Sequence, residues 1–184
     1  MLEQFELKNG TLVTIKRLFV DDYEKDNNYE FVHSWLHKVD RYLGMEFLEE
    51  ELENDKASWY KSLANLEEMI NIGALHEEKI IGSVSLQIKV KNKRLQHRGE
   101  WGITIHPDFQ NNGLGTRLLE IIEVIAREKG LIRLEAGYVE GNEIAVHLYV
   151  NKMGYTIEGR CPFALRYDNG TYEAEILIGK ILDG

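Results

Sequence analysis

"HPDFQNNGLGTRLLEIIEVI", residues 106–125, joins the end of an expected strand to a strongly apolar helical pattern. Between the two lie polar residues and the glycines Gly113 and Gly115. The first N–H groups of a helix have no partner inside it and carry partial positive charge, so they suit phosphate oxygens. Glycines let a ligand approach that backbone because they have no Cβ, and the Thr116 hydroxyl adds a donor. The stretch therefore predicts a loop that binds a diphosphate.

Two other phosphate-binding motifs do not match this stretch. A P-loop ends in Gly-Lys-Ser/Thr, whereas Leu114-Gly115-Thr116 has no lysine to reach a terminal phosphate. A dinucleotide-binding fingerprint needs a third glycine at the position of Leu118 and follows the first strand of its domain. Nucleoside triphosphate chemistry and dinucleotide binding are therefore disfavoured.

The composition is that of one ordered, acidic domain. The chain has 184 residues, of which 43% are hydrophobic, so a single domain over residues 1–184 is expected. Its formal net charge of -9 argues against nucleic-acid binding. No apolar run approaches the roughly 18 residues that a membrane span needs, so no membrane association is expected. The lone Cys161 cannot form an internal disulfide and the first residues lack a secretion signal, so a cytoplasmic protein is expected.

The order of strand and helix patterns predicts a mixed sheet with helices on its faces. Alternating and β-rich runs predict strands at 11–18, at 72–90 as a hairpin, and at 100–105, 131–139, 155–160 and 171–182. Helical periods lie within 21–71, broken near Gly44, and at 114–125 and 142–153. No repeat or Pro/Gly/Ser linker marks a domain boundary.

Two sequence blocks stand in matching strand and helix contexts. ITIHPDFQNNGLGTRLL carries a Q-x-x-G-x-G pattern through Gln110, Gly113 and Gly115. LEAGYVEGNEIAVHLYVNKMGY is a strand and helix that carry Asn142, Ala145, Leu148, Tyr149, Gly154 and Tyr155. Together the blocks resemble the GNAT superfamily, amine N-acetyltransferases that use acetyl-coenzyme A. The blocks span roughly 97–160, and the residues before about 72 match only in the order of elements.

The resemblance implies a fold and a cofactor site. The fold is α/β (α+β), a mixed, mostly antiparallel central sheet splayed between two parallel strands, with helices on both faces. Acetyl-CoA, a co-substrate, would lie between those strands, with its pantetheine arm on the backbone of Ile103, Thr104 and Ile105 and steadied by Asn142. Its pyrophosphate would be held by Gln110, Asn111, Asn112, Gly113, Leu114, Gly115 and Thr116.

Acetyl transfer to an amine needs two proton transfers, because the ammonium loses a proton and the departing thiolate gains one. The resemblance implies that Tyr149 is the acid, and a phenol with a pKa of about 10 is protonated at pH 7. The alternative is that Tyr149 is an aromatic on the buried face of its helix. Glu100 is the candidate base, against the alternative of a solvent-facing strand end. Glu135 on the neighbouring strand is its rival, and a water chain without a dedicated base is a third option.

The acidic balance suits a cationic acceptor, such as a polyamine, an aminoglycoside, a lysine side chain or a protein N-terminus. The run Glu49-Glu50-Glu51 and the pair Glu67-Glu68 belong to this charge, but a solvated face explains them better. Three aromatic residues of the early helices are candidates for an acceptor pocket and equally for the core; they are Trp35, Trp59 and Tyr42.

Other conspicuous residues have simple explanations. His33 and His37 are four apart on a helix, but without a third clear ligand they are interpreted as exposed or packing histidines, and no metal is expected. His106 is interpreted as a strand-end residue. Cys161 has no histidine partner motif nearby and is interpreted as a packed thiol.

The favoured function is transfer of an acetyl group from acetyl-CoA to a primary amine, of a small molecule or a protein or peptide, by direct attack in a ternary complex. The alternative is a catalytically inactive acyl-CoA-binding sensor or scaffold module. A different short acyl donor also stays open. The last strand, TYEAEILIGKIL, is a candidate for a homodimer contact and equally for a purely internal role.

Overall fold

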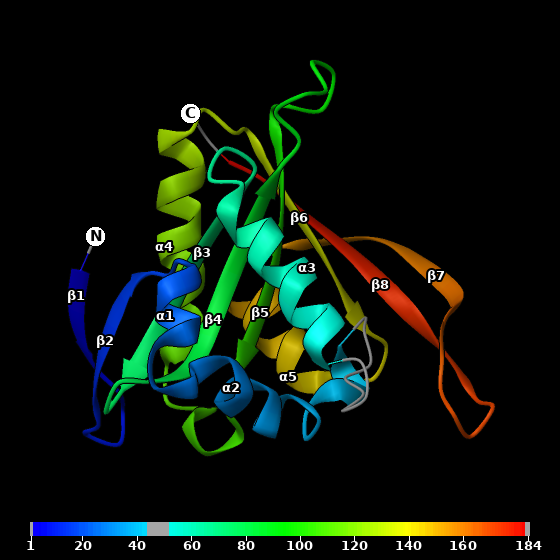
Figure 1. Ribbon diagram of the computed structural model, residues 1–184. Coiled ribbons are helices and arrows are strands. Elements are labelled where there is room, and N and C mark those ends of the chain that lie inside the picture. The colour runs from blue at the N-terminus through cyan, green and yellow to red at the C-terminus, as the bar shows by residue number, and fades with distance from the viewer. Residues whose placement is uncertain (1, 44–51, 183–184) are drawn as a thin grey trace.

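The computed structural model describes residues 2–43 and 52–182. Their strands form one sheet and are β1 Leu2–Glu6, β2 Leu12–Arg17, β3 Met69–His76, β4 Lys79–Ile88, β5 Arg98–Ile105, β6 Arg133–Val139, β7 Thr156–Arg166 and β8 Tyr172–Ile181. Their order across the sheet is β1-β2-β3-β4-β5-β6-β8-β7 (Figure 1). Every strand expected from the sequence is present, and β1 is an addition.

Helical segments connect the strands. The early ones are α1 Val20–Glu24, η1 Lys25–Asn27, α2 Asn28–Leu36, η2 Asp40–Tyr42 and α3 Leu52–Ala64. The later ones are η4 Pro107–Phe109, α4 Leu114–Glu128, α5 Glu143–Ala145 and η5 Val146–Lys152. The segments η1, η2 and η4 are 3-10 helices, and η5 is π-helical.

β5 and β6 are parallel, and they separate part of the way along their length. Their pairing runs from Arg98 opposite Arg133 to Glu100 opposite Glu135. From Ala136 onward β6 continues to pair with β8, while β5 continues to pair with β4. The other neighbouring strands are antiparallel, so the predicted mixed, mostly antiparallel sheet with a splay between two parallel strands is confirmed (Figure 1).

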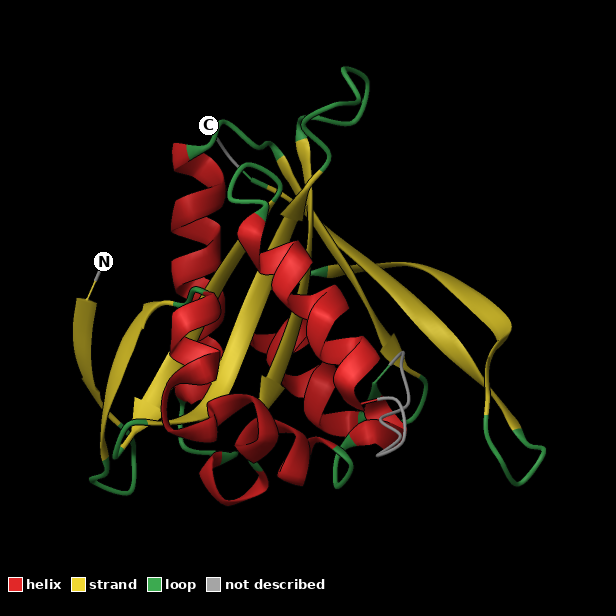
Figure 2. Ribbon diagram, viewed as in Figure 1, coloured by secondary structure: helices red, strands yellow, loops and turns green. Residues whose placement is uncertain are grey.

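Helices cover both faces of the sheet, and each face has its own core (Figure 2). The apolar stripe predicted for α4 packs on one face, where Leu114, Leu118, Ile121 and Ile122 are buried and Ile125 is partly buried. The other face packs against α1, α2 and α3 through a second cluster, which includes buried residues of β3 and β4. The end of β5 and the loop between β5 and α4 are therefore left free to form a site.

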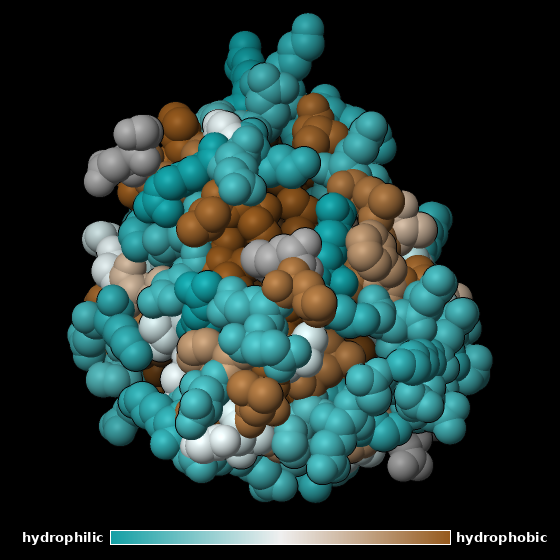
Figure 3. Space-filling model, turned by 90° about the vertical axis from the view of Figure 1, so that its left-hand side faces the viewer, coloured by the Kyte–Doolittle hydropathy of each residue, from teal (hydrophilic) through white to brown (hydrophobic). Residues whose placement is uncertain are grey.

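β1 lies at one edge of the sheet and is fastened to α4. The Arg117 guanidinium forms a bidentate contact with Glu3, at 2.8 and 2.7 Å. After β1, the backbone N–H of Lys8 donates to the carbonyl of Asn112 at 3.1 Å. Figure 3 shows the face at this edge, where apolar side chains gather within a largely hydrophilic surface. The hairpin of β1 and β2 therefore holds the loop before α4 from the outside.

The structure corrects parts of the expected layout. The helical region ends at Ala64 and β3 already begins at Met69, so the helix expected up to residue 71 is too long. Cys161 is exposed on β7, not packed, because β7 is the edge strand of the sheet and extends to Arg166. The expected break near Gly44 and the run 49–51 lie outside the described residues. In the described part of the chain, no helix is long and apolar enough to cross a membrane.

Candidate active site

The loop before α4 presents bare backbone at the start of a long helix. Gly113 is the N-cap residue, with φ of +89°, a left-handed conformation that suits glycine. No side chain caps this helix end, so its first N–H groups face outward without an intrahelical partner. The preceding loop is held by the Gln110 Nε2, which donates to the carbonyl of Ile105 at 3.0 Å. The arrangement is that of an anion-binding helix N-terminus.

The two glycines of the motif have different roles. A Cβ on Gly113 would meet only the Lys8 side chain, at 3.8 Å or more, so this glycine is required by its backbone conformation. A Cβ on Gly115 would lie 2.9 Å from Leu148 Cδ2 and 3.2 Å from Ile105 Cδ1. Gly115 therefore lets α4 pack closely against β5 and η5. The role predicted for this glycine from the sequence was to let the ligand approach the backbone.

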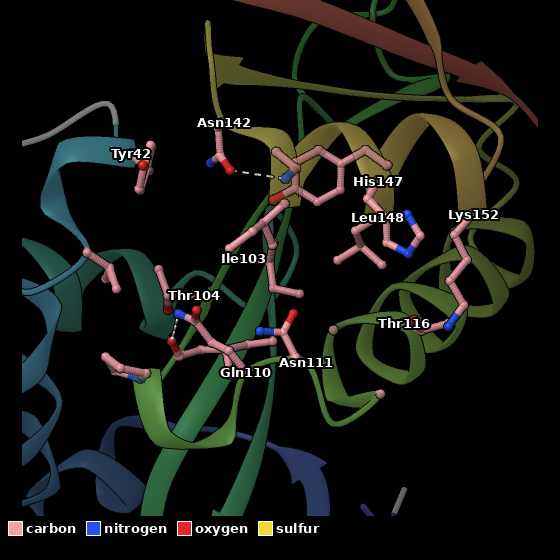
Figure 4. A pocket seen from close by; sticks show the side chains of 18 of the residues that line it. Tyr42, Ile103, Thr104, Gln110, Asn111, Thr116, Asn142, His147, Leu148 and Lys152 are labelled. Carbon is pink, nitrogen blue, oxygen red and sulfur yellow. Dashed lines mark hydrogen bonds between the residues drawn. The ribbon is translucent and has the colours of Figure 1, made fainter. Parts of the chain in front are cut away.

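A pocket opens from this loop along the end of β5 (Figure 4). One wall is formed by residues of β5, of the loop and of the first turn of α4, namely Ile103, Thr104, Ile105, Pro107, Gln110, Asn111, Gly113, Gly115 and Thr116. The other wall is formed by α5 and η5 and includes Asn142, Ile144, Ala145, His147, Leu148, Tyr149 and Lys152. Its far end is lined by Lys38 and Val39, which follow α2, by Tyr42 of η2 and by Leu43 directly after it. Lys8 lines the pocket from the β1–β2 turn.

Most of the residues predicted for the cofactor line this pocket. Two predicted residues do not. The Leu114 side chain is buried in the core, with 1% exposure. The Asn112 side chain turns back to donate to the carbonyl of Gln110 at 2.9 Å. Asn112 and Leu114 therefore shape the loop, and only their backbone is placed near the helix start.

The pocket also contains cationic side chains that were not predicted from the sequence. Lys8, Lys38 and Lys152 all line it. In Figure 4 the Lys152 side chain points from η5 toward Thr116, at the start of α4. Lys152 lies three residues after Tyr149 in the same segment, η5, and both residues line the pocket. Lys8 arrives through the pairing of β1 with β2, which no local pattern specifies.

Tyr149 sits in the π-helical segment η5, a distortion that often marks functional sites. Its ring stands against Trp101 and Tyr138, with centroid separations of 4.8 and 6.1 Å. Burial raises the pKa of Tyr149 to about 12. The described part of the chain gives its hydroxyl no hydrogen-bond partner. Tyr149 is therefore a protonated phenol, at pH 7, in the wall of the pocket.

Asn142 begins the other wall. Its Oδ1 accepts a hydrogen bond from the backbone N–H of Ala145 at 3.1 Å, which makes it the N-cap of α5. The dashed line in Figure 4 marks this bond. The cap fixes the side-chain amide at the rim of the pocket.

The two candidate base residues lie where β5 and β6 are still paired. Glu100 and Glu135 are direct neighbours across the two strands. The Glu100 side chain is 55% exposed, lies 4.0 Å from Lys89, and is not among the described residues that line the pocket. The Glu135 carboxylate forms ion pairs with Arg98 and Arg133. Neither carboxylate is therefore placed in the pocket itself.

Other residues singled out from the sequence take structural positions. Trp35 is a core residue with 1% exposure, and Trp59 packs edge-on against Tyr23, with centroids 5.9 Å apart. Of the three early aromatics only Tyr42 lines the pocket. His106, directly after β5, packs among Phe31, Trp35 and Phe109, and burial lowers its pKa. Its position at the strand end is as expected.

The histidines at 33 and 37 form contacts within their own helix. His33 Nδ1 lies 3.0 Å from the carbonyl of Tyr29, and burial lowers the pKa of His33. His37 Nδ1 lies 3.4 Å from the carbonyl of His33. Within residues 2–43 and 52–182, no three His, Cys, Asp or Glu side chains are grouped as a metal site would need.

The acetyltransferase (GNAT) family model matches residues 17–155. No curated protein matches the chain. Among solved structures, the acetyltransferase of the GNAT family from Streptococcus pneumoniae has 26% identity and a TM-score of 0.73, covering 93% of this chain and 99% of its own. Ribosomal-protein-alanine N-acetyltransferase from Brucella melitensis has 19% identity and a TM-score of 0.73, covering 91% and 99%.

A third solved structure is yncA from Salmonella typhimurium with its cofactor acetyl-CoA, at 20% identity and a TM-score of 0.71, covering 93% of this chain and 94% of its own. At such identities the second and third structures bear on the fold alone. The family model covers most of the chain, and it includes the loop before α4, Asn142 and Tyr149. The chain belongs to the GNAT family of acetyltransferases.

Proposed function

We propose that the chain is an N-acetyltransferase that moves an acetyl group from acetyl-CoA to a primary amine, by direct attack in a ternary complex. One observation carries this proposal. A single pocket joins the uncapped N-terminus of α4, which suits a diphosphate, to the protonated phenol of Tyr149. Acyl transfer from a thioester that carries a diphosphate requires both of these groups, one to bind the diphosphate and one to protonate the sulfur.

The residues of the pocket fit a coenzyme A thioester. The start of α4 offers N–H donors, and Lys8 and Lys152 add positive charge at the same place. Beyond Glu100, the β6-facing edge of β5 has no strand partner among the described residues, so its backbone groups are available to amides of the pantetheine arm. Asn142 lies across from that edge, in the opposite wall. Acetyl-CoA, when bound, supplies the thioester carbonyl.

The reaction is a proton-coupled displacement. The amine nitrogen forms a bond to the carbonyl carbon and the carbon–sulfur bond breaks. Tyr149 gives its hydroxyl proton to the departing sulfur, because a phenol with a pKa near 12 stays protonated at the pH of the cell. The nitrogen carries an extra proton once it is bonded to the carbonyl carbon, and water passes that proton to the phenolate, which restores Tyr149. The sequence-based choice of Glu100 as base stays a prediction, and its exposed position beside Lys89 does not favour it.

The acceptor class is a primary amine, on a small molecule or on a protein. Ribosomal-protein-alanine N-acetyltransferase from Brucella melitensis, which shares this fold, is named for an amine acceptor on a protein. The net charge of -9 supports cationic acceptors in general. These features support a primary amine as the class of acceptor, and experiment has to identify the acceptor molecule.

The test is release of free thiol from acetyl-CoA. Purified protein is mixed with acetyl-CoA and, in separate reactions, with spermidine, a lysine-containing peptide or a peptide that starts with alanine. Release that depends on one of these amines, with a matching mass gain of one acetyl group on the amine, is the expected result. Tight binding of acetyl-CoA without amine-dependent release from any acceptor would instead support a catalytically inactive sensor or scaffold.

A further inference from the structure

Glu175 lies on β8, on the face of the sheet opposite the α4 core. Its neighbours in the strand, Ala174 and Ile176, are buried, and Ile176 belongs to the core on the α4 side. Because side chains alternate along a strand, Glu175 and Leu177 point to the other face. This is the face that α1, α2 and α3 cover farther along the sheet. Tyr149 packs against Trp101 and therefore belongs to the α4 side.

The Glu175 carboxylate does not extend straight into solvent but lies across β6 at Gly137. A Cβ built on Gly137 would overlap Oε1 and the carboxyl carbon of Glu175. Gly137 pairs with Leu177, so Glu175 reaches it diagonally, from the position opposite Val139. The absence of a side chain at Gly137 is therefore what allows the carboxylate to occupy this place.

Gly137 is the first residue on this face of β6 beyond the part that pairs with β5. It lies two residues after Glu135, the last residue of β6 that pairs with β5. The corresponding residue of β5, two after Glu100, is Gly102. A Cβ on Gly102 would have only the Ser85 Oγ nearby, at 3.7 Å. Both strands therefore lack side chains on this face where they part, a place called the gap below, and the Glu175 carboxylate lies against Gly137 on its β6 side.

The neighbouring carboxylates on this face have cationic partners in the structure. Glu135 pairs with Arg98 and Arg133. Glu173 pairs with Arg41 and also accepts from the Tyr167 hydroxyl, at 3.4 Å. For Glu175, the described residues provide no cation within ion-pair distance and no hydrogen-bond donor to its carboxylate. Its register partners on the two neighbouring strands are Val139 on β6 and Cys161 on β7.

We propose that Glu175 is the residue that binds the ammonium group of the acceptor and takes its proton. The inference rests on the proposed acetyl transfer and adds the group that prepares the amine. The acceptor enters from the Glu175 face, loses one proton to the carboxylate and attacks through the gap between Gly102 and Gly137. The carbon–nitrogen bond forms as the carbon–sulfur bond breaks, and Tyr149 protonates the sulfur from the other face. The nitrogen then loses its second proton through water to the Tyr149 phenolate, and Glu175 releases the first proton to solvent.

The assignment of Glu175 also predicts which amine acceptors the site would select. A carboxylate without a cationic partner attracts an ammonium group and disfavours an acceptor with a carboxylate beside its amine. The flanking Glu135 and Glu173 are neutralised by arginines, so Glu175 contributes the uncompensated charge at the gap. Spermidine and lysine-containing peptides are therefore favoured acceptors over free α-amino acids.

The structure provides a matched control. Glu158 also lies over a glycine on this face, because a Cβ on Gly179 would overlap its carboxylate. The Glu158 carboxylate is paired with Arg133, however, at the end of the sheet where β5 and β6 are joined. Glu158→Gln therefore makes the same chemical change in a similar setting without touching the gap.

The experiment measures kcat/KM for the best acceptor of the amine panel, with wild type and with the variants Glu175→Gln, Gly137→Ala, Glu158→Gln and Glu100→Gln. Glu175→Gln is expected to lower kcat/KM by about 10²-fold or more, which is the range of general-base catalysis. Gly137→Ala displaces the carboxylate and is expected to cost about 10-fold, whereas Glu158→Gln stays within about two-fold. The loss in Glu175→Gln should shrink as the pH approaches the pKa of the acceptor, about 10.4 for a lysine amine, because a free amine needs no base.

The outcomes separate the inference from the function on which it rests. If wild type itself releases no coenzyme A with any amine, the proposed transfer fails. If wild type is active and Glu175→Gln, with an unchanged melting temperature and acetyl-CoA affinity, keeps wild-type kcat/KM, the assignment of Glu175 is overturned. A selective loss in Glu100→Gln instead would move the base to Glu100 and likewise overturn it.

Discussion

The ring of Tyr149 stands edge-on to the ring of Trp101, with centroids 4.8 Å apart and planes at 81°. Trp101 is buried on β5 and makes a second edge contact with Tyr155, at 5.3 Å. Such edge-to-face pairs hold aromatic rings in a fixed orientation. The strand that would bind one side of the proposed thioester thus also sets the position of the proposed acid.

Replacing Tyr149 with phenylalanine removes the proton donor and keeps the ring contacts. We expect kcat to fall by about 10²-fold to 10³-fold, within the range of general-acid catalysis, while the Kd for coenzyme A stays within about two-fold. Stopped-time thiol release and isothermal titration calorimetry measure the two quantities. A variant with wild-type kcat would exclude Tyr149 as the acid.

The raised pKa of Tyr149 predicts the alkaline side of the pH profile. Because burial raises this pKa to about 12, the phenol keeps its proton through the range in which an unperturbed tyrosine begins to lose it. The rate should therefore show no fall attributable to Tyr149 between about pH 9 and 11, and should fall only as the pH passes through about 12. The profile of kcat at saturating substrates tests this. A descending limb centred near 10 that Tyr149→Phe abolishes would contradict it.

Much of this site is readable from the sequence because its parts are local. Three segments show this: the loop, the helix that follows it, and the block from Asn142 to Tyr155. Each combines a backbone requirement with a fixed spacing, so its helix or strand was predicted at the correct position. Gly113 is such a case, since its left-handed backbone is a property of one residue.

What the sequence did not reveal depends on pairing between distant segments. Lys8 enters the pocket only because β1 pairs with β2 and its turn bonds to Asn112. Glu175 reaches the splay through the register of β8 on β6, which places it diagonally across from Gly137. Strand register is set by packing across the whole sheet, so no short pattern identifies these two residues. Cys161 was misjudged for the same reason, because the sequence does not show which strand lies at the edge.

Gly115→Ala tests the packing role of the second glycine. The new methyl group would lie 2.9 Å from Leu148 Cδ2 and 3.2 Å from Ile105 Cδ1, so α4 or η5 has to shift. We expect the free energy of unfolding to fall by about 1 to 3 kcal/mol, as for other overpacked sites. Urea denaturation measures it, with Gly159→Ala as control, since a Cβ there would meet Leu177 at an ordinary 3.7 Å. Equal stability of the two variants would show that the close approach at Gly115 is not needed.

The lysines beside the helix start predict a salt-dependent affinity. Removing both charges with Lys8→Ala and Lys152→Ala should raise the Kd for coenzyme A by about 10-fold at low salt, and by less at high salt, because ions screen exposed charges. Lys129→Ala, at the other end of α4, is the control and should leave the Kd unchanged. Calorimetric titrations at two salt concentrations give the comparison. A double variant with wild-type affinity at low salt would remove the lysines from the phosphate site.

The contact between Arg117 and Glu3 predicts how β1 responds to acid. The hydrogen bonds from Arg117 hold the pKa of Glu3 below its usual value. The folded state thus binds this proton more weakly than the unfolded state, so the stabilisation is present above the unfolded pKa of about 4.3 and is lost as the pH falls through the folded pKa. Glu3→Gln should cost up to about 1 kcal/mol at pH 7 and nothing at pH 2.

Urea denaturation at the two pH values checks this, with Glu6→Gln on the same strand as control. Glu6 is exposed, so its replacement should have little effect at either pH. A cost of Glu3→Gln that is the same at pH 7 and pH 2 would contradict an ionic origin.

The central claim is that the backbone before and at the start of α4 binds the diphosphate of acetyl-CoA and directs the thioester to Tyr149. The most direct measurement is a crystal structure of the protein grown with acetyl-CoA. We expect phosphate oxygens within hydrogen-bond distance of N–H groups between Asn111 and Thr116, and the sulfur beside the Tyr149 hydroxyl. Electron density that places the diphosphate elsewhere, or a loop without the ligand at saturating concentration, would contradict the account.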